Sequence, residues 1–315
     1  MKLFYYKRRD GFSNFGDELN NWLWHKLLPE FFDEDETTTF IGIGTLLNQL
    51  LPQRIPQAQR LIIFSTGVGY EQPLKTLDKN WKLYCVRGKL SAKKLGLSPD
   101  LAITDGAILT RRLYQPSLEK IYRFTFMPHI HHATFAGERW QNICEQIGFH
   151  YLDPRSSVDE VLSTISQTKI LLAEAMHGAI IADTFRVPWI PIITSPRILP
   201  FKWQDWCSSI AVEYYPYFLS PLVKSYPQYA GGIRSSLNAF SHWKNSLLQF
   251  PNFRQIWQQQ EQVSGTQLLK ISQTGRQQLS SDTQLESLTV QLEEKLDILR
   301  KDWCSNLYSP RQNVE

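Results

Sequence analysis

One segment of the sequence combines ionisable side chains with the pattern of a strand that leads into a helix. In "KILLAEAMHGAIIAD", residues 169–183, an apolar run precedes Glu174, and His177 stands just before Gly178 and a second apolar run. The start of a helix lowers the pKa of a histidine, whereas a nearby carboxylate raises it. This combination suits proton transfer near neutral pH, so His177 is our candidate acid or base, with Glu174 as its orienting partner. A core histidine bonded to the backbone is the alternative.

Four other turns combine glycine with the end of a predicted strand: "SNFGDE", "GIGT", "TGVG" and "CVRGKLS". Glycine lets backbone N–H groups approach a ligand, and helix N-termini attract anions. Ligands of open α/β sheets bind beyond the carboxyl ends of the strands, so these turns are expected to line a site. Turn geometry alone is the alternative reason for each glycine. The residues that we expect to contact an acceptor, or to support those that do, are Asn14, Gly16, Asp17, Gly44, Gly67 and Gly69.

Two charged residues at strand ends are further candidates. Arg87 in "VRGKLS" is a candidate anion clamp, because a guanidinium matches a carboxylate or phosphate in a fork; a surface ion pair is the alternative. Asp105 in "ITDGA" is expected either to bind a hydroxyl or to cap the next helix.

A cluster of histidines follows another predicted strand in "MPHIHH". His129 and His131 have the spacing of metal ligands, but no cysteine or aspartate accompanies them at a recognised spacing. We therefore predict no metal, and a contact with phosphate or sugar or a structural role stays open for both residues.

The order of elements predicts an α/β protein. Apolar runs alternate with helical patterns over residues 1–115, among them a short strand in "DLAITDGAILT", and the alternation restarts after residues 112–120. Such alternation is typical of parallel sheets with helices on both faces. We predict two Rossmann-like domains that face each other across a cleft, residues 1–115 and 116–235, followed by a helical, Gln-rich tail, 236–315.

The predicted tail has two parts that differ in composition. Residues 254–284 are rich in Gln and Ser, which predicts loose order. The leucines beyond them recur at spacings of three and four, which predicts an amphipathic helix that packs on the body or, alternatively, forms a short oligomerising coiled coil. Those leucines are Leu285, Leu288, Leu292, Leu296 and Leu299.

Composition narrows the class of protein. The net charge of the 315 residues is +4, which suits a small anionic substrate better than nucleic acid. No segment reaches the roughly 20 apolar residues of a membrane span, and the four cysteines form no CxxC pair. We expect a cytoplasmic protein with reduced thiols, and attachment to the inner membrane surface stays open.

Residues 1–215 resemble the polysaccharide pyruvyl transferase family in the order of their motifs. These motifs are "NFGDELN", "GIGT", "GVG", "VRGKLS", "TDGA" and "EAMHGAIIAD". The chain looks most similar to the branch that ketalates sugars of bacterial exopolysaccharides. The resemblance implies a fold like that of GT-B glycosyltransferases. It also implies phosphoenolpyruvate as the pyruvyl donor, a glycan acceptor that is free or lipid-linked, and no further cofactor.

The family's last motif usually reads Ser-Arg-Leu-His-Gly, and here it reads Glu-Ala-Met-His-Gly. Ala175 replaces the arginine that would grip the donor, so Arg197 or Lys202 is expected to substitute for it. Arg87 and Asp105 fall at two further family positions, and the family's proline beside the aspartate is Gly106 here. The residues expected to bind the donor are Arg87, Arg197, Lys202 and Gly178.

Two other functions fit part of these patterns. A nucleotide-sugar glycosyltransferase would share the fold and the anion-binding turns, because a fold does not fix a function. A non-catalytic glycan-binding or scaffold protein would explain the missing arginine and the helical tail.

Overall fold

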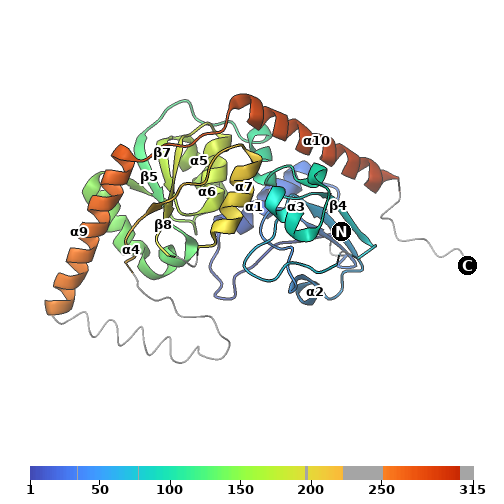
Figure 1. Ribbon diagram of the computed structural model, residues 1–315, viewed down its shortest axis with the longest axis horizontal. Helices are drawn as coiled ribbons and strands as arrows, with labels where there is room; N and C mark the ends of the chain where they lie inside the picture. Colours follow the sequence, from blue (N-terminus) through green and yellow to red (C-terminus); the bar gives the residue numbers. More distant parts are fainter. Residues whose placement is uncertain (34, 77, 196–197, 223–250, 306–315) are drawn as a thin grey trace, which may run out of the picture.

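The computed structural model describes residues 1–33, 35–76, 78–195, 198–222 and 251–305. Within these ranges the chain forms two parallel β-sheets with helices packed around them, followed by two long C-terminal helices (Figure 1). The α/β class and the helical character of the C-terminal region are therefore confirmed.

The first sheet has four parallel strands in the order β1-β2-β3-β4, so β1 lies at an edge. The strands are β1 (Lys2–Phe4), β2 (Thr38–Ile41), β3 (Arg60–Phe64) and β4 (Trp81–Cys85). The helices of this half are α1 (Phe15–Leu27), α2 (Leu51–Arg54), α3 (Lys89–Leu95) and the 3-10 helices η1 (Pro99–Leu101) and η2 (Gly106–Arg112).

The strand expected in "DLAITDGAILT" does not form. Its pairing is reduced to one parallel bridge between Val86 and Ala102. The side chain of Ser98 accepts from the Asp100 N–H and caps η1, and Asp105 caps η2 in the same way. These caps favour two short helical turns over an extended segment.

The second sheet has five parallel strands in the order β6-β5-β7-β8-β9. The strands are β5 (Tyr122–Met127), β6 (His150–Tyr151), β7 (Thr168–Ala173), β8 (Trp189–Ile193) and β9 (Tyr217–Phe218). The helices are α4 (Ile130–Ile147), α5 (Val158–Ser166), α6 (Met176–Thr184) and α7 (Pro200–Ser209).

Helix α6 lies at the centre of the molecule (Figure 1). It packs against α1 and η2, which follow strands of the first sheet, and against α5 from the second half. Every residue of α6 except His177 is buried, as the apolar run at its centre predicts. Helix α6 therefore holds His177 rigidly between the two halves.

Helix α9 (Pro251–Thr274) packs along α4 at one flank of the molecule (Figure 1). Leu268 and Ile271 are buried, and a Cβ on Gly265 would lie 3.2 Å from the Ile143 side chain. The expected loose order of residues 254–284 is thus wrong. The glutamines compose the polar face of a helix whose apolar face is covered by α4.

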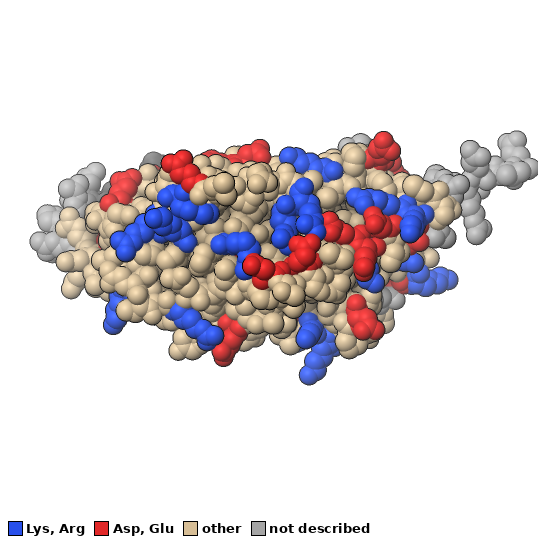
Figure 2. All heavy atoms as spheres, turned by 90° about the horizontal axis from the view of Figure 1, so that it is seen from above, with Lys and Arg blue, Asp and Glu red and all other residues tan. Residues whose placement is uncertain are grey.

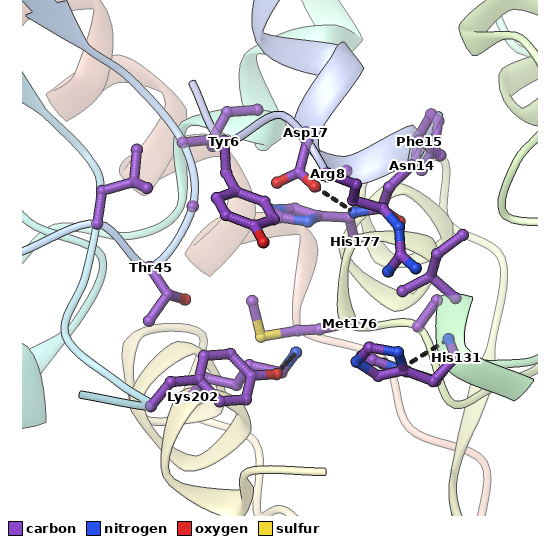
Figure 3. Close-up of a pocket in the computed structure, with 18 of the residues that line it drawn as sticks. Tyr6, Arg8, Asn14, Phe15, Asp17, Thr45, His131, Met176, His177 and Lys202 are labelled. Atoms are coloured by element: carbon purple, nitrogen blue, oxygen red, sulfur yellow. Dashed lines mark hydrogen bonds between the residues drawn. The ribbon is translucent and has the colours of Figure 1, made fainter. Parts of the chain in front are cut away.

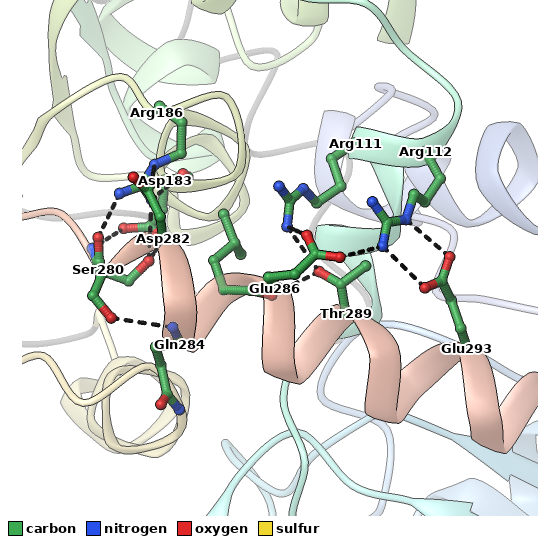
Figure 4. Close-up of polar contacts among 12 residues, drawn as sticks. Arg111, Arg112, Asp183, Arg186, Ser280, Asp282, Gln284, Glu286, Thr289 and Glu293 are labelled. Carbon is green, nitrogen blue, oxygen red and sulfur yellow. Dashed lines mark hydrogen bonds and ion pairs between the residues drawn. The ribbon is translucent and has the colours of Figure 1, made fainter.

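Helix α10 (Asp282–Cys304) joins the two halves from outside (Figure 4). Its five predicted leucines are buried in the main core, so this apolar face packs on the body. Arg111 forms an ion pair with Glu286, and Arg112 forms ion pairs with Glu286 and Glu293. Just before the helix, Ser280 donates its backbone N–H to Asp183 of α6 over 2.8 Å.

No described helix is long and apolar enough to cross a bilayer. Seen from the side of α10, lysine and arginine side chains are interspersed with aspartate and glutamate side chains (Figure 2). This face therefore presents mixed charge and resembles an ordinary solvated surface.

Candidate active site

A cavity of about 380 Å³ lies beyond the carboxyl ends of strands from both sheets (Figure 3). Its lining comes from the segments that follow β1, β2, β3, β5 and β7, together with Lys202 of α7. Its volume is within the ~300–1,000 Å³ typical of small-molecule sites. The position is the one that the glycine turns predict for a ligand site.

Three helices begin at this cavity. The lining includes Asn14–Asp17 at the start of α1, His129–His131 at the start of α4 and Ala175–His177 at the start of α6. Helix N-termini carry partial positive charge and unsatisfied N–H groups. Their convergence makes the cavity a favourable environment for an anion.

His177 faces a carboxylate from the other half of the chain. Its Nε2 lies 3.6 Å from Oδ2 of Asp105, and both atoms are buried without a hydrogen-bond partner among the described residues. The other carboxylate oxygen of Asp105 accepts from the Ala107 N–H over 3.0 Å, which is the predicted cap. A carboxylate at this position faces the ring nitrogen and can orient the imidazole when Nε2 carries a hydrogen.

Gly16 makes room for the His177 ring. A Cβ on Gly16 would lie 2.1 Å from His177 Nδ1, so no other residue fits there without moving the imidazole. The sequence singled out this glycine for approach to a ligand. The structure shows that its backbone approaches the histidine.

Asp17 lies beside His177 at the cavity wall (Figure 3). Its Oδ2 accepts from the Asn14 side chain over 2.7 Å. Burial raises the pKa of Asp17 to about 6, although the Asn14 hydrogen bond and the charges of His177 and Lys202 oppose that shift. Asp17 is therefore a carboxyl group that can hold or release a proton near neutral pH.

The raised pKa predicts a pH-dependent stability effect. The folded protein binds the Asp17 proton more tightly than the unfolded chain does, so the stabilising contribution is present at low pH and lost as the pH rises through about 6. Asp17→Asn should raise the free energy of unfolding by about 1–3 kcal/mol at pH 8, with little gain near pH 4. Urea unfolding at both pH values, with exposed Asp100→Asn as control, measures this difference. An equal change at both pH values would contradict the assignment.

Three cationic side chains line the cavity, Arg54 together with Lys202 and Arg8. Lys202 is nearly buried, and its Nζ donates to the Tyr70 hydroxyl over 2.8 Å without an ion pair to any described carboxylate. Arg8 lines the same cavity and pairs with Asp10, its neighbour in the loop after β1. The sequence predicted Lys202 but missed Arg8, whose one signal is its place after the first strand.

His129 and His131 also line the cavity. Burial, together with the positive charges of Arg8, His132 and Lys202, lowers the pKa of His131 to about 4. Burial and nearby Lys202 lower the pKa of His129 well below its usual range. Both rings are thus neutral at pH 7, and a neutral imidazole carries one N–H donor and one acceptor nitrogen. In the described part of the chain, no group of three His, Cys, Asp or Glu side chains is arranged to hold a metal.

Glu174 has a different partner from the one that its sequence position suggests. It is fully buried, and its carboxylate accepts from the ring of His132 over 2.5 Å and from the N–H groups of His129 and Thr194. Burial opposes its charge, but the charge of His132 and these hydrogen bonds lower its pKa overall. The prediction that Glu174 orients His177 is therefore wrong. It fixes the start of α4 instead.

Arg87 lies outside the cavity lining and is fully buried. Its Nε donates to Asp205 over 3.0 Å, and its terminal nitrogens donate to Thr45 and to the carbonyls of Gly44 and Val68. The predicted anion clamp needs correction, because these partners already occupy the guanidinium. Arg87 ties α7 to the loops of the first sheet.

Of the remaining predicted residues, some line the cavity and others pack outside it. Gly44 lines the cavity with φ +129°, a conformation that favours glycine. Gly67 packs on the Arg87 guanidinium, Gly69 on Thr45 and Leu199, and Gly178 on Met127, all outside the lining. Arg197 lies outside the described residues.

The sequence that forms this fold and this cavity matches the model of a known enzyme family. The family model for polysaccharide pyruvyl transferases matches residues 11–196, which include the starts of α1, α4 and α6. The chain belongs to this family and is a pyruvyl transferase.

A curated relative agrees with that assignment. Over 218 residues the chain is 42% identical to the succinoglycan biosynthesis protein ExoV of Rhizobium meliloti (strain 1021). The match covers 69% of this chain and 67% of that protein.

Proposed function

We propose that this enzyme transfers the pyruvyl group of phosphoenolpyruvate to a sugar of an exopolysaccharide or its precursor, where two hydroxyls close a ketal. The observation that carries the proposal is one cavity in which Lys202, Arg8 and three helix N-termini surround a space beside His177 and Asp17. The relative's part in succinoglycan biosynthesis supports an exopolysaccharide acceptor.

The donor carries a carboxylate and a phosphate, and the cavity offers two sources of positive charge for them. Lys202 is a nearly buried ammonium without an ion pair to a described carboxylate, which suits one anionic group. The N–H groups at the start of α6, where Ala175 replaces the family's arginine, suit the other. Arg8 stands at the same cavity and balances the charge of Asp10 until the donor binds.

The reaction needs a proton donor and a base. A proton adds to C3 of the donor, and C2 becomes an electrophile that a sugar hydroxyl attacks while it loses its proton. The C2–O bond to phosphate then breaks, and a second hydroxyl adds to C2 with loss of another proton. The products are the ketal and inorganic phosphate: the hydroxyls release two protons, and two are taken up, one at C3 and one by the departing phosphate.

Asp17 and His177 divide this work in our proposal. Asp17, protonated below about pH 6, supplies the proton to C3. His177 lies on α6 and is oriented by Asp105. It receives the proton of the attacking hydroxyl. His129 and His131, both neutral, bind the acceptor or the departing phosphate through hydrogen bonds.

The two sheets are proposed to belong to two Rossmann-like domains in a GT-B-like arrangement, with the donor in the cleft. The lining of one cavity by segments from both halves supports this arrangement. A lipid-linked acceptor, a cytoplasmic location at the inner membrane and self-association remain predictions.

Donor binding separates this function from a nucleotide-sugar glycosyltransferase. Phosphoenolpyruvate should raise the melting temperature of the protein, because a ligand that binds the folded state stabilises it. UDP- and GDP-sugars at the same concentration should not. The opposite pattern would favour the glycosyltransferase, and stabilisation by neither donor would favour a non-catalytic glycan-binding protein.

Lys202→Met tests the donor contact. The variant keeps the length of the side chain and removes its charge, so the KM for phosphoenolpyruvate should rise roughly tenfold to a hundredfold. Initial rates of phosphate release measure it, and Lys169→Met, at an exposed lysine of β7, is the control. An unchanged KM would show that Lys202 does not contact the donor.

A further inference from the structure

A second cavity of about 730 Å³ adjoins the active-site cavity. It lies along β1, the edge strand of the first sheet, and the segment around α2. Tyr6, Arg54 and Glu71 line both cavities. A molecule whose end occupies the first cavity can therefore extend past these three residues into the second.

The junction has the chemistry of a sugar contact. Tyr6 is 39% exposed, and the guanidinium carbon of Arg54 lies 5.5 Å from its ring centre. An exposed aromatic face packs against the apolar C–H face of a pyranose, while the phenol hydroxyl stays available to sugar hydroxyls. The lining of the second cavity also includes Phe4 and Ile55, which add apolar surface.

The second cavity also carries excess positive charge. Its lining holds four basic residues and two acidic ones, and one pair of these, Lys2 and Glu36, forms an ion pair. Lys7 stands over the ring of Tyr5 at 5.3 Å, and neither Lys7 nor Arg9 forms an ion pair with a described carboxylate. The surface thus favours a ligand that is both sugar-like and anionic.

Building on the proposed function, we propose that this second cavity, the acceptor groove, binds the part of the acceptor glycan that extends beyond the pyruvylated sugar, and that this part carries a phosphate or a carboxylate. The reacting hydroxyls must reach the donor near His177, so the rest of the glycan has to leave the first cavity. The adjoining space at Tyr6 and Arg54 is open, aromatic and cationic.

Fragments of succinoglycan, freed of acyl and ketal groups, are the probes. One series is neutral and increases in length. The other two carry a phosphate or an aldonic carboxylate at the reducing end. Affinity, measured by calorimetry, should rise with length, and an anionic group should strengthen binding by about tenfold. The more effective anionic series identifies whether the groove prefers phosphate or carboxylate.

The charge-reversed variant Lys7→Glu/Arg9→Glu should lose this tenfold gain and bind neutral fragments within about twofold of the unsubstituted protein. The control Lys169→Glu/Lys270→Glu has the same change in net charge at exposed sites far from both cavities and should keep the gain. The inference is overturned if long fragments bind no tighter than short ones, or if both double variants behave alike.

The melting-temperature response to phosphoenolpyruvate is recorded for each protein. If phosphoenolpyruvate raises the melting temperature but fragment affinity does not depend on length, the donor assignment is supported and the acceptor groove is not. Length-dependent binding without a response to phosphoenolpyruvate would support the groove and count against the donor.

Discussion

His177→Gln is expected to lower kcat by about 10²–10⁴, the usual effect of losing a general acid or base. Glutamine approximates the size of the imidazole and keeps a hydrogen-bonding group near Asp105, but it cannot exchange a proton. The starts of α1 and α6 should stay in place, because Gly16 already leaves room for a planar side chain. Phosphate release from phosphoenolpyruvate, with saturating acceptor, measures the loss.

Two controls make the result specific. His25→Gln makes the same chemical change at an exposed position of α1 and should leave kcat unchanged. Asp105→Asn should lower kcat less than His177→Gln, since the imidazole remains but loses the carboxylate that faces its Nε2. A near-normal kcat in His177→Gln would move proton transfer to another group, and an unfolded variant would indicate a structural histidine.

Arg87→Met is expected to lower the free energy of unfolding by about 3–5 kcal/mol, because it leaves the Asp205 carboxylate buried without its cation. The KM for phosphoenolpyruvate should stay close to its original value in the fraction that folds, since Arg87 does not line the cavity. Urea unfolding and initial rates at low temperature give the two quantities.

The double variant Arg87→Met/Asp205→Leu separates the two explanations. If the loss comes from an unpaired buried charge, removing that charge should recover part of the stability, and the two substitutions will not be additive. A donor KM that rises many-fold while stability is unchanged would instead restore Arg87 as the anion clamp.

The sequence predicted the place of His177 because the signal is local. An apolar strand, a turn and a second apolar run specify a strand end, and the helix that starts at Met176 then points its first turn into the cavity. The same local pattern predicted the approach of Asn14–Asp17 and of His129–His131.

The partners of these residues were not predictable in the same way. Glu174 is the nearest carboxylate in sequence, but its backbone still pairs with Met127 of β5, so its side chain reaches His132 and leaves His177 to Asp105. Asp105 belongs to the other half of the chain. The contacts between the two halves depend on how the sheets pack. The hydrophobic periodicity of the sequence carries no information about this packing.

The roles of Arg8 and Arg87 were not predictable from the sequence either. A guanidinium after a strand suits an anion or an ion pair equally well, and the carboxylate that it meets in the fold decides between them. Arg87 meets Asp205 in the core, and Arg8 meets Asp10 at the cavity. Helix α9 differs for another reason: its Gln-rich composition suggests disorder, but α4 covers the few apolar side chains that it has.

Mass spectrometry of the acceptor, after incubation with the enzyme and phosphoenolpyruvate, shows whether the enzyme transfers a pyruvyl group. We predict that exopolysaccharide fragments without ketals gain the mass of one pyruvyl ketal, with one phosphate released for each ketal formed, and that His177→Gln forms the product at least about a hundredfold more slowly. Transfer of a sugar from a nucleotide donor under the same conditions, with no pyruvylated product from phosphoenolpyruvate, would contradict the account.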